Sequence, residues 1–149
     1  MNIHETYMKQ ALNEARKAFD DDEVPVGAVI THEGVIIARA HNQIKTLKDP
    51  TAHAEMIAIT QAAAHLANER LIDCDLYVTI EPCAMCVGAA VLARLRAIYY
   101  GTTEPKTGAC GSALTLTDPG LFNHNLEATG GILDSECRRI IQEFFLNKR

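Results

Sequence analysis

The sequence predicts a single domain of the α/β class, because helical and strand-like patterns of apolar residues alternate along its whole length. The chain has 149 residues, a size at which one domain buries roughly two-thirds of the surface that its unfolded chain exposes. No internal repeat, linker or low-complexity stretch interrupts the alternation. We therefore expect residues 1–149 to form one domain around one core.

The first part of the chain is predicted to form a helix and a hairpin. Apolar residues recur at helical spacing and favour a helix from about residue 3 to Asp20. Two β-branched runs, at 26–30 and 35–38, are separated by a short segment that contains Gly34. This pattern is typical of a β-hairpin.

The remaining part is predicted to alternate between helix and strand. An alanine-rich helix over residues 52–66 carries His53 and Glu55. After it we expect, in order, a buried strand at 76–80, a helix from Pro82, a strand at 97–100, a loop over 102–119, a strand near 126–129 and a C-terminal helix. Open α/β sheets bind ligands beyond the carboxyl ends of their strands, so the segment after the strand at 76–80 is a natural place for a site.

Two short segments, residues 53–55 and 82–86, carry the candidate chemistry. They supply three zinc-type ligands, His53, Cys83 and Cys86, and one further carboxylate, Glu55. A structural zinc usually takes four protein ligands, whereas a hydrolytic zinc takes three and keeps a position for water. The set therefore predicts a catalytic metal site, in which Glu55 acts as general base and then as general acid.

The spacing of these residues supports one shared site. Cys83 and Cys86 are three residues apart directly after Pro82, which fits the first position of a helix, so both sulfurs lie on one face. The positive end of the helix dipole also favours the thiolate form. His53 and Glu55 are two apart and would diverge in a regular helix, so we expect them at an irregular helix start.

A Cys-x-x-Cys pair has two other common interpretations, a thioredoxin-like redox pair and half of a structural zinc knuckle. A structural site would need a fourth ligand, and none of the remaining cysteines and histidines lies at ligand spacing to another. These residues are Cys74, Cys110, Cys137, His4, His32, His41, His65 and His124. The three cysteines among them are expected to be packed thiols.

Composition bears on location and on partners. An odd count of 5 cysteines, with no charged-then-apolar leader, argues against a secreted disulfide framework. No apolar run approaches the ~20 residues of a membrane span. We therefore expect a cytoplasmic protein. The formal net charge of −5 gives no overall attraction to a polyanion. Basic residues do gather locally, and they are either solvated faces or RNA contacts: Lys45, Lys48, Arg94, Arg96, Arg138, Arg139, Lys148 and Arg149.

Beyond composition, the motif of a histidine, a glutamate two residues later and a downstream Pro-Cys-x-x-Cys resembles that of the zinc nucleobase deaminases. Further segments extend the resemblance, from about Tyr7 to Phe145, to the bacterial tRNA-specific adenosine deaminases of the cytidine deaminase superfamily. These segments are residues 23–28, 40–42, 49–55, 76–83 and 106–124. The resemblance implies a three-layer α/β/α cytidine-deaminase-like fold with a central mixed sheet of about five strands.

The resemblance also implies a site and its partners. One Zn²⁺ per subunit would be held by His53, Cys83 and Cys86, with Glu55 as the catalytic residue. Substrate contacts would come from Asn42, the backbone of Ala54, Lys106, His124 and Phe145, although Asn42 also suits a turn, His124 also suits packing, and one of Phe144 and Phe145 is expected in the core. The implied partners are a tRNA anticodon stem-loop and a second copy of the chain, in a homodimer.

The implied reaction is hydrolytic deamination of adenosine to inosine at the wobble position of a tRNA anticodon. A deaminase of a free nucleobase or nucleoside, of the guanine or cytosine type, is the main alternative, and a non-catalytic zinc-bearing subunit is another, against which the intact Glu55 argues. Asn125 stands where the family usually has arginine, and Glu104 where aspartate is common. Both departures concern RNA contacts and leave the metal chemistry untouched.

Overall fold

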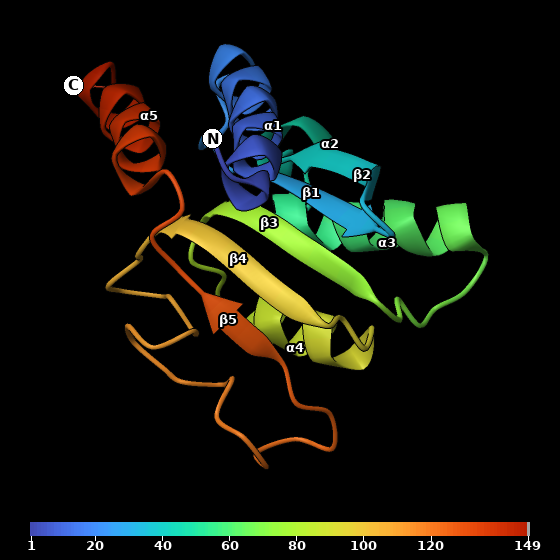
Figure 1. The fold of residues 1–149 in the computed structure, drawn as a ribbon. Coiled ribbons are helices and arrows are strands. Elements are labelled where there is room, and N and C mark those ends of the chain that lie inside the picture. Colours follow the sequence, from blue (N-terminus) through green and yellow to red (C-terminus); the bar gives the residue numbers. More distant parts are fainter. Residues whose placement is uncertain (149) are drawn as a thin grey trace.

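The computed structural model describes residues 1–148 and contains one mixed sheet between two layers of helices (Figure 1). In chain order the elements are α1 (Ile3–Asp20), β1 (Gly27–His32), β2 (Val35–His41), α2 (Ile44–Leu47), α3 (Ala54–Leu66), β3 (Cys74–Ile80), α4 (Ala84–Leu92), β4 (Ala97–Thr102), β5 (Glu127–Thr129) and α5 (Asp134–Leu146). The 5 strands have the order β2-β1-β3-β4-β5. The predicted three-layer fold class is thus confirmed.

The two faces of the sheet are covered by different helices. β1 pairs antiparallel with β2 and β3, and β3-β4 and β4-β5 pair parallel. Because successive side chains of a strand point to opposite faces, Val29 and Tyr77 join the core under α1, together with Met8 of that helix. Their neighbours on the same strands pack under α3 and α4: Ala28, Ile30, Leu76 and Val78. The central strands are therefore buried on both faces.

Helix α1 and the hairpin confirm the prediction for the first part of the chain. Asn2 and Glu5 form a capping box, in which the Glu5 amide donates to Asn2 Oδ1 at 2.9 Å. The buried stripe of α1 follows helical spacing and consists of Met8, Ala11, Ala15 and Ala18. Within the described part of the chain, no helix is both long and apolar enough to cross a membrane.

Two helix starts differ from the predicted ones, and one short helix was not predicted. Helix α3 begins at Ala54 and not at residue 52, because Asp49 Oδ1 accepts the Thr51 amide at 2.8 Å and keeps the preceding turn out of the helix. Helix α4 begins at Ala84, so Pro82 precedes the N-cap instead of occupying the first helical position. Helix α2 has only 4 residues and no apolar periodicity that a sequence pattern reveals.

The close packing of α1 on β1 depends on Gly27. A Cβ atom at this position would lie 1.9 Å from the Ala11 carbonyl oxygen and 2.4 Å from the Ala15 nitrogen, both backbone atoms of α1. Gly27→Ala is therefore expected to lower the free energy of unfolding by about 3 kcal/mol or more, measured by urea unfolding at saturating zinc.

Gly88→Ala is the matched control for this prediction. A Cβ at Gly88 would meet nothing within 4 Å, and alanine in a helix interior stabilises by up to about 1 kcal/mol relative to glycine. Equal stabilities of the two variants would contradict the close contact between α1 and β1.

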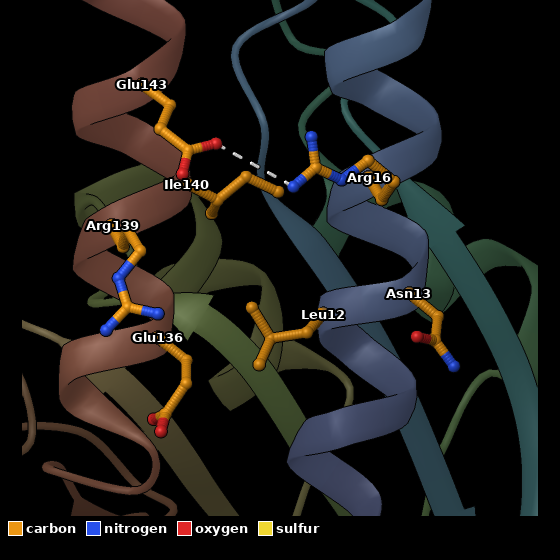
Figure 2. Close-up of a pocket in the computed structure, with 7 residues that line it drawn as sticks. All are labelled: Leu12, Asn13, Arg16, Glu136, Arg139, Ile140 and Glu143. Carbon is orange, nitrogen blue, oxygen red and sulfur yellow. Dashed lines mark ion pairs between the residues drawn. The ribbon is translucent and has the colours of Figure 1, made fainter.

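Helices α1 and α5 lie side by side and leave a cleft between them (Figure 2). The cleft encloses about 360 Å³ and is lined by Leu12, Asn13, Arg16, Glu136, Arg139, Ile140 and Glu143. Arg16 and Glu143 face each other across it, with 3.8 Å between Nη2 and Oε2. Its lining balances two arginines with two glutamates and contains no cysteine or histidine, so the cleft offers no metal ligand of the predicted type.

Candidate active site

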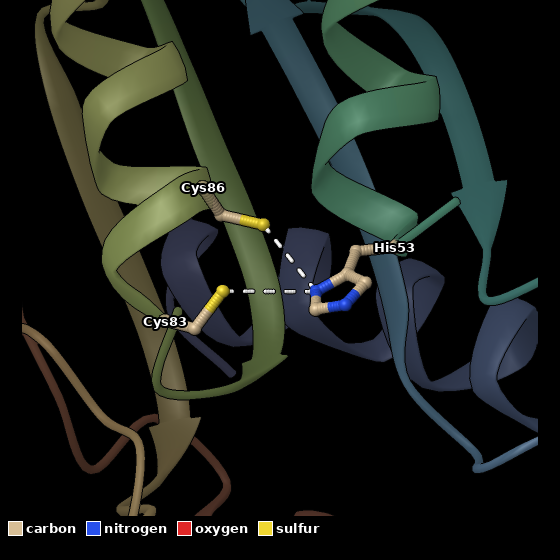
Figure 3. Close-up of side chains that lie close together, drawn as sticks. All are labelled: His53, Cys83 and Cys86. Atoms are coloured by element: carbon tan, nitrogen blue, oxygen red, sulfur yellow. Dashed lines mark hydrogen bonds between the residues drawn. The ribbon is translucent and has the colours of Figure 1, made fainter. Parts of the chain in front are cut away.

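The two predicted segments meet where α3 and α4 begin (Figure 3). His53 is the N-cap residue of α3 and has extended backbone angles, φ −71° and ψ 150°. Cys83 is the N-cap residue of α4, with φ −77° and ψ 175°, and Cys86 lies in the first turn. Since His53 precedes the helix and Glu55 lies within it, the two side chains converge as the prediction of an irregular helix start requires.

The spacing of the three candidate ligands fits a zinc ion. His53 Nδ1 lies 3.7 Å from Cys83 Sγ and 3.6 Å from Cys86 Sγ, and the three ligand atoms are all within 4.8 Å of one another (Figure 3). Tetrahedral zinc with ordinary Zn–S and Zn–N bond lengths separates sulfur from nitrogen by about 3.6 Å. The chemistry of the set, one imidazole and two thiols, also suits zinc.

The thiols of Cys83 and Cys86 differ in pKa, so one ionises before the other. Hydrogen bonds from Cys86 and from His53 lower the pKa of the Cys83 thiol to about 3, against the opposing effect of burial. The pKa of the Cys86 thiol is raised, first because it donates to Cys83 and then because it is buried. The hydrogen bond to Cys83 likewise raises the pKa of His53. Cys83 is therefore the first of the two thiols to become a thiolate, the form that binds metal.

Glu55 is buried beside the ligands, with 3% of its surface exposed. Burial raises the pKa of its carboxyl above the ordinary value, because the charged form loses its hydration. A carboxyl in this state holds a proton more readily than an exposed one. A group that can both accept and release a proton suits general acid–base catalysis.

A cavity of about 230 Å³ opens beside the ligands. Its lining consists of Val24, Val26, Asn42, Ile44, His53, Glu55, Ile80, Glu81, Cys83, Glu104 and Thr107. Buried Asn42 accepts a hydrogen bond from the Ala54 amide, with 2.8 Å between Oδ1 and N. This contact uses the oxygen of the Asn42 amide, so Nδ2 is the group that can donate a hydrogen bond to a molecule in the cavity.

Glu81 accepts hydrogen bonds from backbone amides near the three candidate ligands. Its carboxylate accepts the amides of Glu104, Cys110 and Ser112 at 3.0, 2.9 and 3.1 Å. Burial opposes the charged form, but the hydrogen bonds from Ser112, Glu104 and Cys110 outweigh it and lower the pKa of Glu81. Glu81 is therefore a structural anion that borders the cavity.

Four predicted substrate residues lie outside the cavity lining, and one of them is Ala54, whose amide donates to Asn42. Lys106 is exposed, and His124 is directed to the backbone, with 2.7 Å between Nε2 and the Leu95 carbonyl oxygen. Phe145 is 50% exposed on α5, whereas Phe144 is 5% exposed and packs in the core. A substrate larger than one nucleoside extends beyond the cavity, so a contact of these residues with RNA stays a prediction.

Most of the gathered basic residues are engaged by neighbouring polar groups. Arg96 pairs with Asp75 at 2.9 Å, Arg138 with Asp134 at 2.7 Å, and Arg94 donates to Asn123 at 3.0 Å. Lys45 and Lys148 both pair with Asp22, and Arg149 lies outside the described residues. These partners favour the solvated-face interpretation for the pairs concerned.

Several cavity residues were not singled out as site residues from the sequence. Val24, Val26, Ile44, Ile80 and Thr107 line the cavity. They carry no chemical signature of their own, since four of them are apolar residues, which usually lie in the core, and the fifth is a threonine. What could have identified them from the sequence is their position in or next to the segments that resemble the deaminase family.

Comparison with known proteins gives concordant similarities. Residues 2–149 match the family model described as MafB19-like deaminase. The chain is 44% identical over 149 residues to a tRNA-specific adenosine deaminase of Bacillus subtilis (strain 168), a match that covers 100% of this chain and 92% of the relative.

Solved structures extend these similarities. A structure from studies of A-to-I editing by tRNA:A34 deaminases at the wobble position of transfer RNA superposes with a TM-score of 0.87 and 44% identity, over 91% of this chain and 98% of that one. A guanine deaminase from Nitrosomonas europaea gives a TM-score of 0.79 and 26% identity, over 94% of this chain and 83% of that one. Similarity in sequence is thus greater to the first structure.

Proposed function

The chain belongs to the family of tRNA-specific adenosine deaminases, and from this premise we propose that it hydrolyses adenosine to inosine at the wobble position of a tRNA anticodon. The observation that carries the proposal is the convergence of His53, Cys83 and Cys86 at zinc spacing beside the buried carboxylate of Glu55. A zinc ion held by these three residues would supply Lewis acidity that makes water nucleophilic at neutral pH. The reaction adds water at C6 of adenine and releases ammonia.

Glu55 moves the protons of this reaction. Its carboxylate takes a proton from the attacking water and delivers it to the ring nitrogen, and then takes the proton of the new hydroxyl group at C6 and delivers it to the departing amine. Burial raises the pKa of Glu55, so its carboxyl holds the transferred proton more readily than an exposed carboxyl would. Val26, Ile44 and Ile80 give the cavity apolar walls, which would limit the access of bulk water once a nucleoside fills it.

Asn42 orients the nucleoside. Its Oδ1 is held by the Ala54 amide, so the nearby Nδ2 donates to an acceptor on the ribose or the base. Because the same bond ties Asn42 to the first residue of α3, the donor is positioned relative to His53 and Glu55 before substrate arrives.

Asn42→Asp tests this orientation. Aspartate keeps the acceptor for the Ala54 amide but replaces the donor with a second acceptor, so we expect kcat/KM to fall about 10- to 100-fold with zinc content unchanged. Asn68→Asp is a matched control, because Asn68 also accepts a backbone amide, that of Arg70 at 2.9 Å, but does not line the cavity. An equal loss in both variants would contradict the assignment.

Assays of product formation test the proposed substrate. Zinc-loaded protein is incubated with an anticodon stem-loop that carries A at the wobble position, and in parallel with free adenine, adenosine, guanine and cytosine, and inosine and ammonia are measured. An anticodon loop is single-stranded, so its base enters the cavity at low unstacking cost. Conversion of the stem-loop alone supports the proposal, whereas turnover of guanine with the RNA untouched would replace it with a free-base deaminase.

We also infer a homodimer in the cytoplasm, where tRNA is available. The family resemblance supports the dimer, and so does an apolar surface across two helices, which includes Leu92 of α4, 81% exposed, and Ile59 and Ala63 of α3. Light scattering at micromolar concentration gives the mass directly. A monomer mass would contradict the dimer without affecting the chemistry.

A further inference from the structure

Two buried carboxylates that are not among the zinc-type ligands, Glu23 and Glu81, bind segments of the cavity wall. Each is 2% exposed. Within residues 1–148, neither forms an ion pair with a lysine or arginine. Each instead accepts hydrogen bonds from the donors of one short segment. Hydrogen bonds to a charged acceptor are about twice as strong as those between neutral groups, so these two anions are strong local restraints.

Glu81 holds the loop that follows β4. Its Oε1 accepts from the Glu104 amide and from the Ser112 hydroxyl, and its Oε2 accepts from the amides of Cys110 and Ser112. The loop backbone also lies directly on the carboxylate, since a Cβ at Gly108 would be 2.4 Å from Glu81 Cδ. The loop thus encloses Glu81 and presents Glu104 and Thr107 to the cavity.

Glu23 holds the first turn of α2. Its Oε1 accepts the Lys45 amide at 3.1 Å, and its Oε2 accepts the Thr46 amide at 2.7 Å and the Thr46 hydroxyl at 2.8 Å. Ile44, the first residue of α2, lines the cavity. A helix of 4 residues has almost no intrinsic stability, so its position depends on such tertiary restraints.

We propose that Glu23 and Glu81 are positioning residues of this deaminase, which hold α2 and the loop over residues 104–112 as preformed walls of the nucleoside cavity. Neither is one of the three clustered zinc-type ligands, and both act through the segments that they bind. The inference rests on the proposed function, since the walls matter for the reaction only if a nucleoside enters this cavity. Misplacement of a wall by about 1 Å is expected to reduce kcat/KM by up to about 100-fold.

Glu81→Gln gives a residue-specific test. Glutamine has one acceptor, which we expect to face the amides of Cys110 and Ser112, while its NH₂ group donates to the Ser112 hydroxyl and opposes the Glu104 amide. Amide exchange of Glu104, followed by NMR, is therefore expected to accelerate about tenfold or more, while Cys110 stays protected. KM for the stem-loop is expected to rise about tenfold with a smaller change in kcat, at unchanged zinc content.

Asp75→Asn is the matched control. Asp75 is a buried carboxylate near the opposite end of β3, and both its oxygens accept from Arg96 at 3.0 and 2.9 Å. Its loss is expected to lower stability without moving KM or the exchange of Glu104. Unchanged Glu104 exchange or unchanged KM in Glu81→Gln would overturn the inference, and so would an equal KM shift in Asp75→Asn.

Glu23→Gln tests the same inference on α2, and it decides the matter if Glu81→Gln does not fold. Faster exchange of the Lys45 amide together with a raised KM supports the inference, and protection equal to wild type overturns it. Failure of the proposed function is recognised separately, because wild-type protein would then leave RNA and nucleosides unchanged. The exchange rates would still show whether the two carboxylates hold these segments.

Discussion

Replacement of Glu55 by glutamine is expected to reduce deamination by roughly 10²- to 10⁴-fold, the contribution typical of a positioned general acid–base. Glutamine preserves the shape of the side chain but does not take the proton of water. Zinc content is expected to stay at one ion per chain, because Glu55 is not among the three clustered ligands. The measurement is inosine formation on the stem-loop, with zinc determined on the same samples.

The same variant is expected to be at least as stable as the wild type. Burial raises the pKa of Glu55 in the folded state. At a pH above the pKa that Glu55 has in the unfolded chain, its ionisation therefore destabilises the folded protein. The neutral amide of glutamine removes this penalty. Glu14→Gln is the control, because Glu14 is also buried, at 4% exposure, but does not line the cavity. Activity within tenfold of wild type in Glu55→Gln would show that another group carries the proton, and loss of zinc would reassign Glu55 as a ligand.

Cys83→Ser is expected to remove zinc and activity together. A serine hydroxyl does not ionise near neutral pH, whereas the pKa of Cys83 is lowered to about 3 by hydrogen bonds from Cys86 and His53. Zinc at 100 times its dissociation constant stabilises a folded protein by about 2.7 kcal/mol. The variant should lose this increment, so zinc should no longer raise its thermal unfolding temperature.

Cys110→Ser is the matched control for the metal site. The Cys110 thiol is partly buried, and burial raises its pKa to about 12, so it stays protonated and does not belong to the ligand cluster. We expect full zinc occupancy in this control. A Cys83→Ser protein that still binds one tightly held zinc would require a different ligand set.

The β1-β2 hairpin, helices α3 and α4, and strands β3, β4 and β5 were predictable because the sequence patterns that indicate them are local. Helix α1 matches its predicted span, since its stripe of apolar residues and its cap lie within one segment of sequence. Helix α2 was not predicted because its first turn is held by Glu23, which is 22 residues from Lys45 and 23 residues from Thr46 in sequence. A pattern within four residues cannot contain that contact.

The sequence by itself determined the chemical inventory of the site: which residues can ligate zinc, and which carboxylate remains to move protons. Ligand identity is a property of the side chains, and their short spacings within residues 53–55 and 83–86 restrict each segment to one helix start. Only the tertiary structure decided the rest, namely that His53 Nδ1 meets both sulfurs and that the oxygen of Asn42 is taken by Ala54. It also placed Lys106 and His124 outside the cavity lining. These outcomes depend on packing between segments 12 to 33 residues apart, and the sheet sets their distances and orientations.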